Sequence, residues 1–254
     1  MTSQSLPKIY LIAGATRGIG LALVDDIAKK DPTAIIYAGG RNISASPQLA
    51  EVAARYPGRV EIVKYIAGDA ETNNAIAKTI REAHGRVDTV IANAGINNYG
   101  APIHEYPAEQ FKEHFAVNTL GPIVLFQSVY TLLQASSSPR FVPVTSMGGS
   151  IKLLENVPKN ICIAGYSTSK TALNWVTRKI HFENEWLVAF PICPGSVSTD
   201  MGNDFVKNYT GGQLSVSWQS PDVAAGMVVD IITASTREKD GGEYHNVEGG
   251  RYPW

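Results

Sequence analysis

Tyr166 and Lys170 lie four residues apart in the stretch GYSTSK (165–170). On a helix, side chains at this spacing are neighbours on one face. A phenol with a pKa near ~10 is a poor acid–base group at neutral pH, and a nearby cation favours its charged form, so the pair could transfer a proton. The alternative is an ordinary tyrosine and an ordinary surface lysine, because a chain with eleven tyrosines produces such spacings by chance.

A glycine-rich stretch, AGATRGIG (13–20), joins an apolar run at 8–14 to a helical pattern at 18–30. Gly14, Gly18 and Gly20 would let the backbone turn tightly and approach a pyrophosphate, to which the helix N-terminus adds partial positive charge. The spacing is G-x-x-x-G-x-G, and the position between strand and helix favours a nucleotide site. A glycine-rich turn without a ligand is the alternative.

The second predicted strand ends in GGRN (39–42). A cofactor with a free ribose 2′-hydroxyl usually meets an acidic residue here. Instead Arg41 follows two glycines, and an arginine fork suits a 2′-phosphate, to which Arg17 could contribute. This pattern predicts NADPH over NADH. The alternative is that Arg41 is a solvated residue after a strand.

Short apolar runs alternate with amphipathic segments along the whole chain. Strands are predicted at 8–14, 34–40, 59–68, 88–95, 140–146, 187–195 and 243–250, and helices at 18–30, 47–56, 71–84, 107–134, 165–186 and 221–235. Strict alternation predicts an α/β fold: a single domain over 1–254, with a Rossmann-type doubly wound parallel sheet of about seven strands and helices on both faces. Pro143 and Pro191 fall inside predicted strands, where they should mark strand ends or bulges. The main irregular stretches are 147–164 and 198–219.

Composition and charge narrow the class of protein. Hydrophobic residues make up 44% and charged residues 18% of 254 residues, as in globular domains, and the net charge is −1 without a basic run. Nucleic acid and membrane are therefore not expected as partners. No signal-peptide pattern is present. Cys162 and Cys193 form no metal-ligand pattern and the five histidines are scattered, which predicts no metal site and a reducing, cytoplasmic location.

Taken in order, these motifs resemble the short-chain dehydrogenase/reductase family, and the resemblance covers nearly the whole chain. The motifs that carry it are AGATRGIG, Asp69 after the third strand, NAG (93–95), Asn118 in VNTLGP, Ser146 in VTSMGG, YSTSK and PGSVSTDM (194–201). The ending GGEYHNVEGGRYPW and the GRN region resemble fungal ketoreductases of the norsolorinic acid type and the sniffer branch of carbonyl reductases. Two departures are Ala13, where the family usually has threonine, and the long interval from Ser146 to Tyr166, whose loop is expected to border the substrate.

The resemblance implies residue roles. The implied catalytic tetrad is Asn118, Ser146, Tyr166 and Lys170. The implied cofactor-binding residues are Gly14, Thr16, Arg17, Gly18, Ile19, Gly20, Arg41, Asp69, Ala70, Asn93, Ala94, Gly95, Tyr166, Lys170, Pro194, Gly195, Val197 and Thr199. Family members usually form dimers or tetramers through the helices at 107–134 and 165–186, so a homodimer or homotetramer is implied.

The implied reaction is NADPH-dependent reduction of a carbonyl group. Tyr166 would be the general acid, with its pKa lowered by Lys170 and the oxidised nicotinamide. Ser146 would donate to the substrate oxygen, and Asn118 would hold a water that connects Lys170 to solvent.

The predicted pocket wall is mostly apolar and aromatic, which suits an apolar or aromatic ketone. Its candidate residues are Asn97, Asn98, Tyr99, Met147, Ile151, Leu153, Met201, Phe205, Tyr209 and Trp218, and residues 201–219 are expected to act as a mobile lid. Three alternatives stay open: an NADP-dependent alcohol dehydrogenase, a reductase-fold protein that catalyses a non-redox step with NADPH bound structurally, and a cofactor-bound sensor or scaffold without turnover.

Overall fold

The computed structural model describes residues 6–209 and 217–254. Its centre is a parallel sheet of six strands in the order β3-β2-β1-β4-β5-β6. The strands are β1 (Ile9–Ala13), β2 (Ile35–Gly40), β3 (Val60–Lys64), β4 (Thr89–Ala92), β5 (Arg140–Pro143) and β6 (Val188–Ala189). Strand order reverses between β1 and β4, so this sheet has a topological switch point there.

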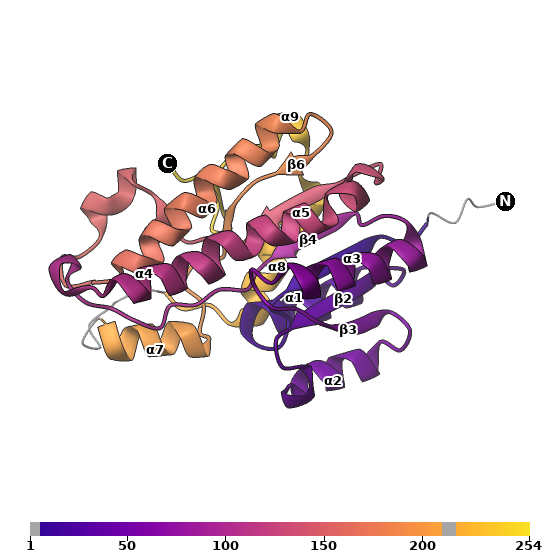
Figure 1. Cartoon of the computed structure of the whole chain (residues 1–254), viewed down its shortest axis with the longest axis horizontal. Helices are drawn as coiled ribbons and strands as arrows, with labels where there is room; N and C mark the ends of the chain where they lie inside the picture. Colours follow the sequence, from indigo (N-terminus) through magenta and orange to yellow (C-terminus); the bar gives the residue numbers. More distant parts are fainter. Residues whose placement is uncertain (1–5, 210–216) are drawn as a thin grey trace.

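Helices cover both faces of the sheet (Figure 1), and the central strands β1 and β4 are accordingly mostly apolar and buried along their whole length. One face packs against α1 (Gly18–Lys30), α2 (Pro47–Arg55) and α8 (Pro221–Ala234). The other packs against α3 (Ala70–His84), α5 (Gly121–Gln134) and α6 (Ala164–Glu183). Side chains alternate along β1: Tyr10 and Ile12 join the first core, and Ile9 and Leu11 join the second. The predicted doubly wound α/β fold is confirmed.

The helical run predicted at 107–134 contains a π-helical turn. It consists of α4 (Ala108–Phe115), a π-helix (Ala116–Leu120) and α5. Wider turns of this kind are rare and occur often at functional sites, and Asn118 lies in the middle of this one. By length and composition the run Ala108–Gln134 could cross a membrane, but half of its apolar window is buried inside the protein, as in a core helix.

The expected seventh strand of the main sheet is replaced by a separate pair. Two short strands, β7 (Ile192–Cys193) and β8 (His245–Asn246), form a two-stranded parallel sheet. Pro191 separates β6 from β7, since proline has no N–H for the ladder. A single bridge from Val144 to Ile192 still connects β7 to the end of β5. Pro143 is the last residue of β5, so both prolines mark strand ends, as predicted.

The stretches predicted to be irregular contain helical turns. Short 3₁₀ turns occupy Met147–Gly149 and Lys152–Asn156. The prediction was wrong for α7 (Asp200–Tyr209), a full helix that includes a glycine. Gly202 is required there because a Cβ would lie 2.9 Å from the Trp218 ring. The remaining helices are α9 (Arg237–Asp240) and 3₁₀ turns at Ile43–Ala45 and Ile103–Glu105. Residues 210–216 of the expected lid lie outside the described residues.

Candidate active site

The predicted site residues gather at the carboxyl ends of β1, β4 and β5, beside the switch point. Crevices at such points are the usual ligand sites of open parallel sheets. Gly14 follows β1 and lies directly against Ala94, which follows β4: a Cβ on Gly14 would lie 2.7 Å from the Ala94 Cα. The glycine-rich loop and the NAG segment are therefore in contact, as the motifs predicted.

The glycine-rich loop is built so that only glycine fits at two positions. Gly14 has a φ of 79°, a conformation that side chains rarely adopt. A Cβ on Gly20 would lie 2.0 Å from the Gly14 carbonyl oxygen. That oxygen also accepts a hydrogen bond from Asn93 Nδ2 at 2.9 Å. Asn93 thus fixes the shape of the loop.

The helix that follows this loop offers its N-terminus to a ligand. Helix α1 begins at Gly18, and within the described part of the chain no side-chain hydrogen bond caps it at Arg17. Its first backbone N–H groups are therefore available for an anion such as a phosphate. The loop and helix together fit the diphosphate of a dinucleotide.

A second wall of the same crevice comes from the PGSVST turn. A Cβ on Gly18 would lie 3.2 Å from the Thr199 methyl group, so the two predicted cofactor segments are neighbours. Arg17 Nη1 pairs with Asp200 Oδ2 at 2.8 Å across them, and both side chains are exposed. Val197 is buried and bridges to Gln219. Pro194 is buried and Gly195 half-buried at the start of this turn.

The predicted adenosine end of the crevice lies at β2 and α3. A Cβ on Gly40 would lie 2.3 Å from the Thr16 methyl group, which places the end of β2 against the glycine-rich loop. Arg41 follows and is exposed. Asp69 caps α3 by accepting a hydrogen bond from the Thr72 N–H at 2.7 Å, and Ala70 begins that helix. Asp69 therefore has a structural role in the cap beside its predicted role near the adenine.

Ser146 and Tyr166 are brought together at the end of β5. Tyr166 lies in the first turn of α6, and the Ser146 side chain is close enough to its hydroxyl to act on its pKa by hydrogen bonding. Ser146 also accepts a hydrogen bond from the Gly148 N–H at 3.2 Å, which starts the 3₁₀ turn. Two hydroxyls therefore face one another where a carbonyl oxygen could bind.

Lys170 lies one turn further along α6 and is almost completely buried. Its Nζ is 5.7 Å from the centre of the Tyr166 ring and donates to the Val144 carbonyl oxygen at 2.9 Å. The predicted pairing of Tyr166 and Lys170 on one helix face is confirmed in its geometry, although the ammonium lies beside the ring.

Asn118 is completely buried in the π-helix, and its side-chain amide group is hydrogen-bonded within the protein. Its Nδ2 donates to the Ile96 carbonyl oxygen at 2.9 Å and to Ser169 Oγ at 3.0 Å, and its Oδ1 accepts from the Ile96 N–H at 2.8 Å. A Cβ on Gly95 would lie 3.2 Å from Asn118 Oδ1 and 3.4 Å from Lys170 Nζ, so both atoms face Gly95.

The pKa shifts of Tyr166 and Lys170 in the structure differ from those that the sequence predicts. Tyr166 is only partly exposed, and desolvation raises its pKa to about 12, while its hydrogen bond with Ser146 acts in the opposite direction. Desolvation also lowers the pKa of Lys170 to about 8. Among the protein's own groups burial is the main cause of the Tyr166 shift and Lys170 is not one of its causes, so the expected lowering of this pKa by Lys170 and the oxidised nicotinamide stays a prediction for the cofactor-bound protein. Tyr166 is therefore a neutral proton donor at physiological pH.

Two buried residues of the site were missed by sequence reasoning. Asn174, one turn after Lys170, accepts from Thr145 Oγ1 at 2.6 Å and donates to the Gly149 carbonyl oxygen at 3.1 Å. The Cys193 thiol accepts from the Met147 N–H at 3.3 Å, and burial raises its pKa. The signal for Asn174 was its spacing, since positions 166, 170 and 174 share one helix face. Cys193 had no comparable signal.

The predicted substrate residues are only partly brought to this crevice. Met147 follows Ser146 directly and is 43% exposed, so it can contact a substrate. Trp218 packs against Gly202 of α7 and is at the surface. Asn97 is half-buried after β4, and within the described residues its Oδ1 is buried without a hydrogen-bond partner. Tyr209 ends α7, but its side chain lies outside what the structure describes.

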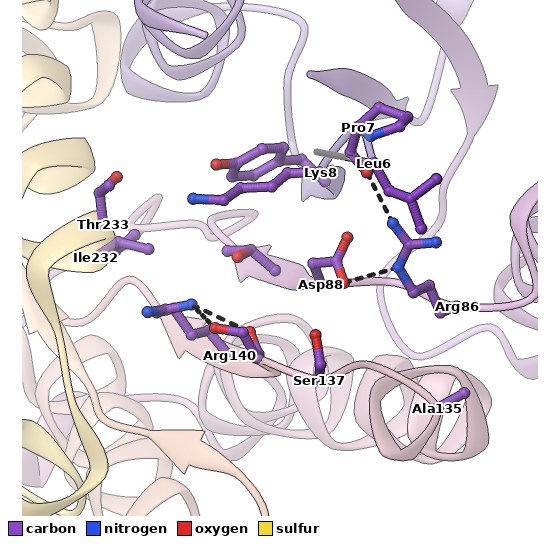
Figure 2. A pocket seen from close by; sticks show the side chains of 13 residues that line it. Leu6, Pro7, Lys8, Arg86, Asp88, Ala135, Ser137, Arg140, Ile232 and Thr233 are labelled. Atoms are coloured by element: carbon purple, nitrogen blue, oxygen red, sulfur yellow. Dashed lines mark hydrogen bonds and ion pairs between the residues drawn. The ribbon is translucent and has the colours of Figure 1, made fainter. Parts of the chain in front are cut away.

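A separate hollow of about 470 Å³ lies at the opposite, amino-terminal edge of the sheet (Figure 2). Three of its charged side chains, Arg86, Asp88 and Arg140, already form hydrogen bonds within the protein. Asp88 accepts from the Ile9 N–H and from Arg86, and Arg140 donates to Ser138 and Ser235. Asp88 ties the start of β1 to the start of β4, and its carbonyl oxygen accepts from the Arg140 N–H of β5 at 2.8 Å, so the hollow belongs to the scaffold and not to the candidate active site.

The chain belongs to the short chain dehydrogenase family, whose model matches residues 8–210. It is therefore an oxidoreductase. Norsolorinic acid ketoreductase of Aspergillus parasiticus is 34% identical over 97% of this chain and 91% of its own length. The norsolorinic acid ketoreductase stcE of Emericella nidulans is 31% identical over 99% and 95%. The resemblance to fungal ketoreductases is confirmed.

Solved structures show the same fold. The NADPH-bound carbonyl reductase from chicken fatty liver has a TM-score of 0.85 at 24% identity and covers 98% of this chain and 100% of its own. The carbonyl reductase Sniffer of D. melanogaster has a TM-score of 0.83 at 21% identity, with coverage of 98% and 100%. Both support a doubly wound α/β architecture for the chain.

Proposed function

We propose that this protein is an NADPH-dependent ketoreductase that acts on an apolar or aromatic ketone. The observation that carries the proposal is the placement of Ser146 beside Tyr166, with Lys170 buried next to them, at the same edge of the sheet as the glycine-rich loop. The ketoreductase relatives agree with this reading. The same site would also oxidise an alcohol with NADP⁺, because the reaction is reversible.

The residues present fit a phosphorylated dinucleotide. The glycine-rich loop and the N-terminus of α1 would hold the diphosphate, and Thr199 would close it from the second wall. Arg41, exposed at the end of β2, would bind the 2′-phosphate. Arg17 would also bind this phosphate after breaking its exposed ion pair with Asp200. That break costs little, because surface ion pairs typically contribute only ~0–1 kcal/mol to stability. When bound, the cofactor supplies a hydride to the carbonyl carbon.

The protein's own residues would supply the proton and hold the carbonyl oxygen. Ser146 would donate a hydrogen bond to that oxygen and stabilise the charge that develops on it. Tyr166 would transfer its proton to the same oxygen as general acid. Lys170 and Asn118, which both face Gly95, would hold a water there through which the Tyr166 proton is replaced.

The surroundings support an apolar substrate. Met147 and Ile151, in the loop after Ser146, are 43% and 70% exposed. A ketone with an aromatic or aliphatic body would bury these side chains, whereas a phosphorylated sugar would need cations in their place. Asn97 would contact the polar end of the substrate, and Trp218 would close its apolar end. Tyr209 is proposed as a substrate residue from the sequence alone.

The proposal extends to assembly and location. Helix α6 carries Trp175 and Phe182, which are 66% and 62% exposed on one stripe of the helix. Burial of two large aromatic side chains between copies would favour a homodimer or homotetramer. Two free cysteines agree with a reducing compartment such as the cytoplasm.

Transfer of deuterium from NADPH that carries deuterium in both C4 positions tests the redox chemistry directly. The purified protein is given the labelled cofactor and a panel of aromatic and aliphatic ketones, and the products are examined by mass spectrometry. We expect an alcohol that carries one deuterium on the former carbonyl carbon. A product without the label would instead favour the non-redox alternative, and unchanged ketones throughout would favour a sensor or scaffold.

A further inference from the structure

Residues Tyr252–Trp254 are hydrogen-bonded to the loop that follows Ser146. The Ser150 hydroxyl donates to the Pro253 carbonyl oxygen at 2.7 Å, and the Lys152 N–H donates to the Trp254 carbonyl oxygen at 3.0 Å. On its other side the segment is joined to the region before β8, because the Tyr252 N–H donates to the Tyr244 carbonyl oxygen at 2.8 Å. We call Tyr252–Trp254 the strap.

The strap encloses the ring of Tyr244. The Trp254 ring lies 5.5 Å from it and the Tyr252 ring 5.4 Å from it, centre to centre. The Arg178 guanidinium of α6 lies 4.7 Å over the Trp254 ring and holds it from the other side. Tyr244 is completely buried as a result, so its ring has one packed orientation.

That orientation aims the Tyr244 hydroxyl at the catalytic serine. The hydroxyl donates a hydrogen bond to the Ser146 carbonyl oxygen. The same residue presents its side-chain hydroxyl to Tyr166. A bond to the backbone of Ser146 therefore limits where the Ser146 hydroxyl can lie.

The opposite side of the serine turn is held by α6. Asn174 is hydrogen-bonded to Thr145, which precedes Ser146, and to Gly149, which lies three residues after Ser146. Helix α6 also carries Tyr166 and Lys170. The serine turn is thus fixed between the helix that bears the proton donor and the aromatic group Tyr244, Tyr252 and Trp254.

We propose that Tyr244, held in place by the strap, is a positioning residue that sets Ser146 and the loop 147–156 at the separation from Tyr166 that carbonyl reduction requires. This inference rests on the proposed function, since it assigns the substrate's carbonyl oxygen to the space between Ser146 and Tyr166. Tyr244 acts through Ser146 and needs no contact with the substrate.

The first test compares Tyr244→Phe with Tyr130→Phe, which removes a hydroxyl from a tyrosine packed between Phe126 and Trp186. Loss of one hydrogen bond should lower kcat about tenfold in Tyr244→Phe. The dissociation constant of NADPH and the melting temperature should stay close to those of Tyr130→Phe. In a Ser146→Ala background, Tyr244→Phe should cause no further loss, because its effect passes through the serine. Independent, multiplicative losses would overturn the proposal.

The second test does not depend on turnover. Trp254→Ala removes the group that holds Tyr244, so backbone deuterium uptake over 147–156 should rise several-fold in hydrogen exchange, while uptake over α8 stays the same. Trp186→Ala is the control, since that tryptophan follows α6 and packs against Tyr130 of α5, away from the strap. Unchanged uptake over 147–156 would contradict the proposed role of the strap, even if the enzyme reduces ketones. If uptake over 147–156 rises in Trp254→Ala but the wild type reduces no ketone, the structural role of the strap is supported and the proposed function is contradicted.

Discussion

At the scale of single residues, burial shifts the pKa values of Tyr166 and Lys170 in opposite directions. Tyr166 has a pKa of about 12 and Lys170 a pKa of about 8, and desolvation is the main cause of both shifts. Each shift favours the neutral form, so the unbound pair is arranged for a protonated phenol. Tyr166 therefore keeps its proton at neutral pH, as the proposed role of general acid requires.

The shift of Lys170 predicts how stability depends on pH. Its pKa is about 8 in the folded protein against 10.5 when exposed, so the unfolded chain binds more protons between these values and folding stability from this group rises with pH. The buried charge costs about 3 kcal/mol below pH 8. Lys170→Met removes that cost, so its free energy of unfolding relative to wild type should fall by about 2–3 kcal/mol from pH 7 to pH 10. Urea unfolding at several pH values measures this, and a constant difference would contradict it.

We expect Arg41 to determine the preference for NADPH over NADH. Arg41→Asp replaces a donor fork with a carboxylate that repels a 2′-phosphate and accepts from a free 2′-hydroxyl. We expect the KM for NADPH to rise at least about tenfold and the preference to move toward NADH. Steady-state kinetics with both cofactors measures this, with the exposed Arg81→Asp of α3 as control. An unchanged NADPH/NADH ratio would show that Arg41 is a solvated residue after β2.

At the scale of elements, the site is built where strands end and helices begin, together with one π-helical turn. The glycine-rich loop lies between β1 and α1, Ser146 lies between β5 and α6, and Asn118 lies in the π-turn between α4 and α5. The π-turn could not be predicted from periodicity, because one wider turn barely disturbs the pattern of apolar residues. Asn118 fills that turn by binding both polar groups of Ile96.

The loop before α1 should tolerate no side chain at its third glycine. Gly20→Ala would place a methyl group 2.0 Å from the Gly14 carbonyl oxygen and push the loop open. We expect the dissociation constant of NADPH to rise at least about tenfold, because the N–H groups of α1 would lose their alignment. Fluorescence titration measures it. The control is Gly226→Ala in α8, where the nearest atom is 3.8 Å from the new Cβ; equal binding by the two variants would contradict the account.

At the scale of the whole molecule, the parallel sheet separates two ends with different roles. The carboxyl ends of the strands carry the candidate active site. The amino ends carry the Asp88 and Arg140 networks around the hollow of Figure 2, which tie the starts of the strands together. A scaffold fixed at one end leaves the loops at the other end free to differ among relatives.

Assembly of the whole molecule should depend on the exposed stripe of α6. Trp175→Glu combined with Phe182→Glu places charges where the proposed interface needs apolar side chains. Sedimentation velocity should show wild type as a dimer or tetramer of the 27.4 kDa chain and the double variant as a smaller species. Val223→Glu, a matched change at an exposed position of α8, should leave the assembly intact. A wild-type monomer would contradict the proposed assembly.

Most of the fold follows from the sequence, because apolar runs and glycine positions are local signals. The sheet, its helices and the meeting of Ser146, Tyr166 and Lys170 were all predicted. The separate two-stranded sheet of β7 and β8, helix α7 and the roles of Asn174 and Tyr244 were not. These features depend on contacts between distant segments, such as the hydrogen bond from Tyr244 to Ser146, which joins residues 98 positions apart.

The central claim is that Tyr166 donates the proton in NADPH-dependent ketone reduction, and the loss of absorbance at 340 nm tests it most directly. Wild type should oxidise NADPH in the presence of an aromatic or aliphatic ketone. Tyr166→Phe should bind NADPH with similar affinity and reduce the ketone at least ~10²-fold more slowly, the usual size of a general-acid effect. Equal rates for the two proteins, or no NADPH oxidation by wild type with any ketone of the panel, would contradict the claim.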